Sequence, residues 1–186
     1  MELDTLNELA AVQSDDVKKS LHLENESLPG WTTEKTDIKS IYLSRIKNIS
    51  KTGYGIWAKY HVFIIKNGDI VPVKYPDTQK LSDFSGYERE RSEVIDNTKA
   101  LLKGEPCNNV LLYGDAGSGK SSTVKAIANE FKDDGLRLIE VKKNQLYSLP
   151  DIMDRISGNP LKFIIFIDDF IFNVQKYIIF TLRASY

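Results

Sequence analysis

The sequence feature that most constrains this chain is a glycine-rich run at residues 114–121, GDAGSGKS. It fits the pattern G-x-x-x-x-G-K-[ST] at every fixed position. The residues before it, NVLLY (109–113), are typical of a strand that is buried on both faces. The apolar residues after it have helical spacing: Val124, Ile127, Ala128 and Phe131. The order of strand, glycine-rich loop and helix predicts an anion-binding loop at a helix N-terminus.

Phosphate binding explains these residue types. Several main-chain N–H groups must converge on a polyphosphate, and glycine leaves their approach open, while the helix adds its positive N-terminal end. Lys120 supplies a compact positive charge for β- and γ-phosphates, and the Ser121 hydroxyl can bind Mg²⁺. The alternative is a chance glycine-rich turn, which the flanking strand and helix disfavour. The residues expected to bind the nucleotide are Gly114, Asp115, Ala116, Gly117, Ser118, Gly119, Lys120, Ser121 and Ser122.

A second acidic element follows downstream. LKFIIFIDD (161–169) is an apolar run that ends in two carboxylates, the form of a Walker B strand. We expect Asp168, with Ser121, to hold the metal and Asp169 to polarise the attacking water. With Lys120, Asp169 forms the candidate catalytic pair. A simple strand-end turn is the alternative, and the spacing from the upstream loop favours the functional interpretation.

Strands and helices alternate through this part of the chain. LRLIEV (136–141) is another candidate strand, and a helix begins at Ser148 with an S-x-x-D capping pattern. Alternation predicts the α/β class, here a P-loop NTPase with a mostly parallel sheet and its ligands at the carboxyl ends of the strands.

The first 75 residues have a different organisation. Leucines and a valine at every third position predict a helix over residues 3–12, and a second helix begins at Asp37. Residues 60–75 hold two β-rich runs around Asn67-Gly68, which predicts a hairpin, and Pro72 places its second strand at a sheet edge. We expect a division into an N-terminal extension (1–75) and a partial nucleotide-binding domain (76–186). Residues 75–105 should begin as a loop and end as a helix, with a buried stripe at Tyr87, Arg91, Val94, Ile95, Thr98, Leu101 and Leu102.

Composition and local sequence argue against several classes of protein. Lys and Arg number 25 and Asp and Glu number 26, so the net charge of −1 gives no strong signal for nucleic-acid binding. The most apolar run, FIIFIDDFIF (163–172), is too short and too acidic to span a membrane. The start of the chain does not have the form of a signal peptide. The single Cys107 suits a reducing cytoplasm.

Longer stretches resemble a known family. These are GYERER (86–91), NT (97–98), residues 108–131, GLRLIEVKKNQLYSLPDI (135–152) and FIIFIDD (163–169). They are similar to the bacterial AAA-type ATPases catalogued as domain of unknown function 815, closely over about 81–169 and less closely back to about 52. The resemblance implies an AAA+ core that binds Mg-ATP, couples hydrolysis to remodelling of an unknown protein partner, and self-associates. It also implies that residues 83–86 lie near the adenine.

The end of the chain departs from that family. After Asp169 the sequence continues as FIFNVQKYIIFTLRASY, in place of a sensor strand and an arginine finger, as in a C-terminally truncated or frameshifted member. The resemblance implies the strand order 5-1-4-3-2, so a missing strand 4 would leave a gap of about 10 Å between the loop strand and the acidic strand. Residues 176–182 have β composition, but only a handful of residues separate them from Asp169. We therefore expect an antiparallel return or an exposed tail rather than a parallel crossover.

We expect an ATP-binding AAA+ protein whose own hydrolysis is impaired. A nonenzymatic fragment with weak nucleotide binding is the first alternative. A P-loop small-molecule kinase is the second, although no acceptor pocket or basic lid can be identified in the sequence.

Overall fold

Six strands form one sheet in the order β2-β1-β4-β5-β6-β3. The computed structural model describes residues 2–23, 29–31, 33, 36–115, 117–172 and 175–183. The strands are β1 (Val62–Lys66), β2 (Asp69–Pro72), β3 (Val110–Tyr113), β4 (Leu136–Lys142), β5 (Lys162–Phe172) and β6 (Gln175–Arg183). β1, β4, β5 and β3 run in one direction, and β2 and β6 run against them. The predicted α/β class with a mostly parallel sheet agrees with this arrangement.

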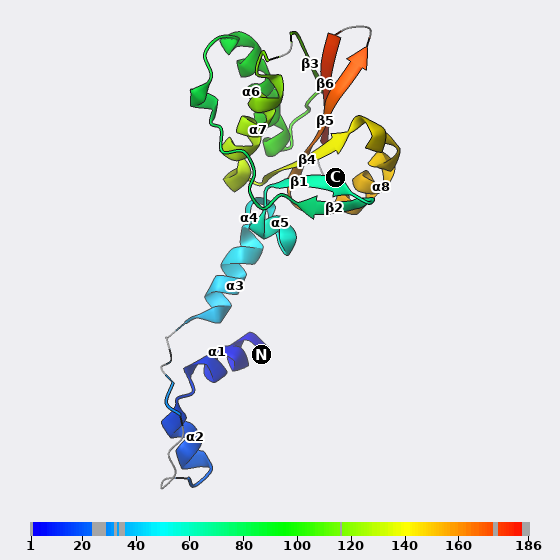
Figure 1. Cartoon of the computed structure of the whole chain (residues 1–186). Coiled ribbons are helices and arrows are strands. Elements are labelled where there is room, and N and C mark those ends of the chain that lie inside the picture. Colours follow the sequence, from blue (N-terminus) through cyan, green and yellow to red (C-terminus); the bar gives the residue numbers. More distant parts are fainter. Residues whose placement is uncertain are drawn as a thin grey trace. The chain divides into compact units, whose positions relative to one another are not determined.

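Helices cover both faces of the sheet (Figure 1). On one face α6 (Glu88–Lys103) and α7 (Lys120–Glu130) pack over Leu136 and Leu138 of β4. On the other face α8 (Leu149–Ile156) packs over Ile139 and Val141 of the same strand. Successive side chains of a strand point to opposite faces, which is why one apolar strand serves two cores. Short helical turns complete this part of the chain: α4 (Ile49–Thr52), α5 (Ile56–Lys59), η1 (Leu81–Asp83), η2 (Lys132–Asp134) and η3 (Lys143–Ser148).

The chain divides into two units, residues 1–47 and 48–186. The hairpin therefore lies in the same unit as the glycine-rich loop, and the expected extension over 1–75 is not one body. The reason is that β1 pairs in parallel with β4, from Val62 opposite Leu138 to Ile64 opposite Glu140.

The hairpin itself is confirmed. Asn67 and Gly68 have φ of 54° and 82°, the left-handed values that a two-residue hairpin turn requires. β2, which ends at Pro72, lies at one edge of the sheet, as the proline predicted.

Two predictions of burial are wrong. β3 is not buried on both faces, because it lies at the other edge of the sheet: Leu111 is 50% exposed and Tyr113 is 72% exposed. Tyr87 was expected on the buried stripe of α6, but it is 64% exposed and lies before the helix with a left-handed φ of 57°. The centre of that stripe is confirmed, since Val94, Thr98 and Leu101 are buried.

The C-terminal strand lies where a gap was expected. β6 pairs antiparallel with β5 on one side and with β3 on the other, which confirms the antiparallel return. Without β6, the facing edges of β3 and β5 would have no ladder partners.

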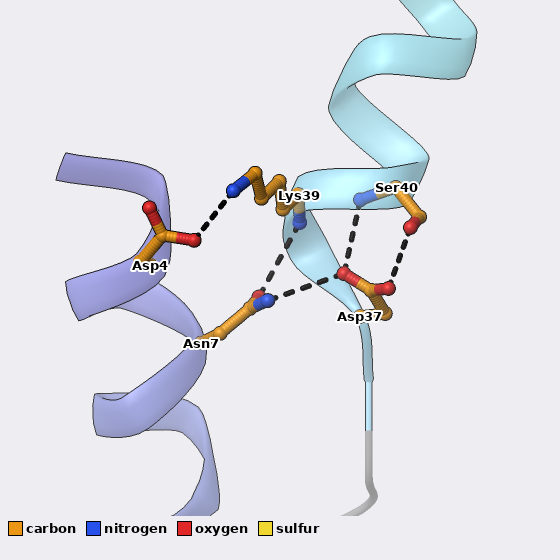
Figure 2. Close-up of polar contacts among 5 residues, drawn as sticks. All are labelled: Asp4, Asn7, Asp37, Lys39 and Ser40. Carbon is orange, nitrogen blue, oxygen red and sulfur yellow. Dashed lines mark hydrogen bonds and ion pairs between the residues drawn. The ribbon is translucent and has the colours of Figure 1, made fainter. Parts of the chain in front are cut away.

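Residues 1–47 form a separate helical unit with α1 (Glu2–Ala11), α2 (Ser14–Ser20) and α3 (Ile38–Lys47). Asp37 caps α3 by accepting the Ser40 N–H at 3.0 Å. Asn7 of α1 accepts the preceding N–H, from Lys39 at 3.3 Å, and donates to the Asp37 carboxylate at 3.1 Å (Figure 2). Lys39 also pairs with Asp4 at 2.6 Å, so α1 is fixed to the N-terminal turn of α3.

Candidate functional site

The glycine-rich loop connects β3 to α7, as the sequence predicted. Gly114, Gly117 and Gly119 have φ of 140°, 81° and 81°. L-residues with a side chain rarely adopt these values, so the loop needs glycine at these positions. Gly119 precedes the first residue of α7, and its carbonyl accepts the Thr123 N–H at 2.8 Å. The first N–H groups of α7 therefore follow directly from the loop. We call residues 114–121 the phosphate loop.

Lys120 lies folded across the phosphate loop. Its ammonium group donates to the carbonyl oxygens of Gly114 at 2.9 Å and Asp115 at 2.7 Å, and to the Ser118 hydroxyl at 3.1 Å. The Ser118 hydroxyl in turn donates to the Asp115 carbonyl at 2.9 Å. An ammonium group has three N–H donors, so these three acceptors satisfy it and the loop is closed on itself.

The acidic pair lies at a bulge inside β5 rather than at the end of the strand. The register of β5 against β6 shifts between Ile167 and Phe170, so that Asp168 and Asp169 together oppose one residue of β6. β5 continues beyond the pair because its last residues pair with β6 instead of β4. Asp168 is the last residue of β5 opposite β4, where it faces Lys142.

Strand register places this bulge level with the start of the phosphate loop. Tyr177 of β6 lies opposite Tyr113 on one side and Phe170 on the other. Tyr113 is the last residue of β3 and directly precedes Gly114. One strand therefore separates the backbone of the bulge from that of the loop, a distance of about 10 Å at the usual strand spacing.

A segment from before α6 borders the phosphate loop. A Cβ atom built on Gly119 would lie 3.9 and 4.0 Å from two ring carbons of Phe84. Arg91 of α6 holds this segment, because its guanidinium donates to the carbonyl oxygens of Phe84 at 3.2 Å and of Gly86. Phe84 therefore lies beside the phosphate loop. The expected position of residues 83–86 near an adenine stays a prediction.

Asn129 fixes an earlier part of the same connection to α7. Its amide donates to the carbonyl oxygens of Asp77 at 2.8 Å and Gln79 at 2.9 Å, and its oxygen lies 2.9 Å from Nε2 of His61. Lys125 pairs with the Asp77 carboxylate at 2.8 Å. Burial lowers the pKa of His61, against the opposing effect of its bond to Asn129. The connection between β2 and α6 is thus fixed to the helix behind the phosphate loop.

The structure brings most of the predicted site residues to one edge of the sheet. Gly114, Asp115, Gly117, Ser118, Gly119, Lys120 and Ser121 belong to the phosphate loop, and Ser122 follows in the first turn of α7. Ala116 lies outside the described residues, and for Asp168 and Asp169 the backbone alone is described.

The sequence reasoning missed the roles of Arg91 and Asn129. Arg91 was expected only on a buried stripe. A cation seven residues after an aromatic residue, beyond a glycine, was the available signal for its contact with Phe84. Asn129 joins residues about 50 positions away, and no local pattern indicates such a contact.

The sequence model of a family described as "Protein of unknown function (DUF815)" matches residues 57–185, more than half of the chain. The chain belongs to this family. The DUF815 match includes β6, which lies beyond the close resemblance at residues 81–169.

One curated relative is the replication factor C large subunit of Staphylothermus marinus. It is 35% identical over 75 residues, which cover 40% of this chain and 17% of the relative. The chain therefore spans a small part of that protein. Together, the two matches support the predicted relationship of this DUF815 protein to AAA+ ATPases. No solved structure matches. Among the described residues, no helix combines the length and apolar character needed to cross a membrane.

Proposed function

We propose that this DUF815 protein binds Mg-ATP at the phosphate loop. The main support for the proposal is the closed conformation of the phosphate loop. Lys120 lies at the N-terminus of α7, and its ammonium group is held by loop oxygens that a polyphosphate would replace. The glycines with positive φ place no side chain over the main-chain N–H groups of the loop, which favours the approach of a phosphate.

The residues at this edge suit a magnesium nucleotide. Mg²⁺ prefers oxygen ligands, and the Ser121 hydroxyl and the Asp168 carboxylate would provide them. The bound ion would offset the negative charge of the phosphates. We assign Asp169, its neighbour in the bulge, to orienting the attacking water.

We further propose that ATP hydrolysis by the chain alone is slow. β6 enters antiparallel between β3 and β5, the position in which the resemblance implies a parallel sensor strand. Coupling of hydrolysis to a protein partner, self-association and a cytoplasmic setting belong to the same proposal. Because self-association would bring a second copy of the chain to the site, the hydrolysis rate should depend on protein concentration.

Titration with a fluorescent ATP analogue tests the proposal. We expect saturable binding with Mg²⁺, and little binding by Lys120→Ala. Lys99→Ala is the control, because Lys99 lies on α6 and pairs with Asp96. Asp168→Asn should reduce the benefit of Mg²⁺ while retaining metal-free binding. Equal binding by Lys120→Ala and the unmodified chain would show that the nucleotide site is elsewhere.

Phosphate release tests the second part. We expect turnover well below the range of about 1–10³ s⁻¹ that is typical of enzymes. Turnover within that range, unchanged on dilution, would contradict impaired hydrolysis.

A further inference from the structure

Arg91 makes three contacts to one short segment beside the phosphate loop. Its Nη1 donates to the Phe84 carbonyl at 3.2 Å, and its Nη2 donates to the Gly86 carbonyl. Its guanidinium carbon lies 5.4 Å from the centre of the Phe84 ring. A planar guanidinium can hold two carbonyl groups and attract an aromatic face at the same time. Arg91 therefore fixes both the backbone and the ring of Phe84.

The segment that Arg91 holds is conformationally strained. Gly86 and Tyr87 are both left-handed, with φ of 80° and 57°. The value at Tyr87 is unfavourable for a residue with a bulky side chain. The Glu88 carboxylate accepts the Gly86 N–H at 2.7 Å and gives the turn a second support. Without Arg91, this turn would lose two of the hydrogen bonds that oppose its relaxation.

The position of Arg91 is energetically unfavourable in one respect. Its Nε atom is buried and has no hydrogen-bond partner among the described residues. A buried donor without an acceptor destabilises a fold, so this guanidinium is not placed for stability alone. Strain and unsatisfied groups of this kind are often found at functional sites.

The ring of Phe84 lies at the boundary of the phosphate loop. Two of its carbons come within 4.0 Å of the place that a Gly119 Cβ would occupy. Gly119 directly precedes Lys120, so the ring lies next to the residue that begins α7. An aromatic side chain in this place can contact a planar base while the loop holds the phosphates.

We propose that Arg91 is a positioning residue for nucleotide binding. It holds the Phe84 ring against Gly119, so that the ring contacts the nucleoside part of the ligand. The family resemblance already implies that residues 83–86 lie near the adenine, and the role of Arg91 goes beyond that resemblance. This inference rests on the proposed function of the phosphate loop. It separates two parts of one site: Lys120 acts on the phosphates, and Arg91 acts through Phe84 on the nucleoside.

Two ligands distinguish these parts. ATP has a nucleoside, and inorganic tripolyphosphate has only the phosphate chain. Calorimetry with Mg²⁺ measures the affinity for each in the unmodified chain and in Arg91→Gln, Phe84→Leu and the double variant. Arg89→Gln is the matched control, since Arg89 lies on the same helix, is highly exposed and pairs with Glu93.

We expect Arg91→Gln and Phe84→Leu each to bind ATP about tenfold more weakly, the scale of one lost base–aromatic contact. Their affinity for tripolyphosphate should be unchanged, and the double variant should lose no more ATP affinity than either single variant. Arg89→Gln should bind both ligands normally. Lys120→Ala should lose both.

Other results would overturn the inference. Normal ATP affinity in Arg91→Gln would show that Arg91 does not position a binding group. Equal loss of both ligands would assign Arg91 to the integrity of the phosphate loop. Should Arg91→Gln fail to fold, normal ATP affinity in Phe84→Leu would be decisive against the inference. The proposed function fails separately, if the unmodified chain binds neither ATP nor tripolyphosphate.

Discussion

The ammonium nitrogen of Lys120 lies 2.9 Å from the carbonyl oxygen of Gly114, so the two ends of the phosphate loop are joined directly. This bond and the two further bonds from Lys120 hold the loop in a compact form. A bound phosphate chain would accept hydrogen bonds from the Lys120 ammonium group. Ligand binding would therefore replace the loop oxygens by phosphate oxygens as partners of this group.

From this exchange of partners we predict that the effect of Lys120→Ala on the free energy of unfolding depends on whether Mg-ATP is present. Lys120→Ala should lower the free energy of unfolding by only about 1 kcal/mol without nucleotide, because hydrogen bonds of this kind have small net values. With Mg-ATP at about 100 times the Kd, the unmodified chain should gain about 2.7 kcal/mol and the variant almost nothing. Urea unfolding with and without Mg-ATP measures both values, with Lys99→Ala as control. A gain shared by Lys120→Ala would contradict the assignment of Lys120.

We predict a large loss of stability when Gly135, which directly precedes β4, is substituted. It has a φ of 96°, and a Cβ there would lie 2.2 Å from the Ser50 carbonyl oxygen. Gly135→Ala should therefore combine backbone strain with a clash against main-chain atoms and cost about 3 kcal/mol or more. Gly158→Ala is the matched control, because Gly158 has a φ of 77° and open space around it. That variant should cost about 1 kcal/mol through strain alone. Equal urea midpoints for the two variants would contradict the prediction.

Local patterns predicted the parts of the fold that depend on neighbouring residues. The glycine spacing placed the start of α7 near Lys120, and Asn67-Gly68 fixed the hairpin turn, since both depend on backbone conformation at a few adjacent positions. The exposure of Tyr113 was not predictable in this way. It follows from strand order, which depends on pairing between β3 and a strand more than 60 residues later.

The same distinction applies to the candidate site. The phosphate loop is one contiguous segment, so its pattern alone indicated its chemistry. The bulge at Asp168 and Asp169 arises only because β5 changes partners from β4 to β6. The contact of Arg91 with Phe84 requires the left-handed turn at Gly86, which the sequence allows but does not impose.

The lowered pKa of His61 leads to a prediction of how the free energy of unfolding changes with pH. Burial lowers its pKa in the folded state from 6.5, although its bond to Asn129 and the charge of Asp133 act in the opposite direction. The unfolded chain therefore binds more protons just below pH 6.5. Stability from the neutral ring is fully present above that pH and is lost as the pH falls toward the folded pKa.

Urea unfolding at several pH values between 7.5 and 5.5 measures this effect. His61→Gln should make the free energy of unfolding less dependent on pH over this interval, while an amide can still donate to Asn129. His22→Gln is the control, because His22 is exposed and lies in the helical unit. The same pH slope in His61→Gln and the unmodified chain would contradict the neutral state of the half-buried ring.

We predict that one residue in the middle of β6 stabilises both neighbouring strands. Ile179 lies opposite Leu111 of β3 and Ile167 of β5. Ile179→Pro removes a main-chain donor and cannot maintain a central strand, so it should cost at least about 2 kcal/mol. Ile179→Val keeps the donor and the β-branched shape, and should stay close to the unmodified chain. Hydrogen exchange followed by mass spectrometry should show lost protection in β3 as well as in β6 for the proline variant alone. If β3 remained protected in that variant, β6 would not be the strand that joins the phosphate loop to the acidic bulge.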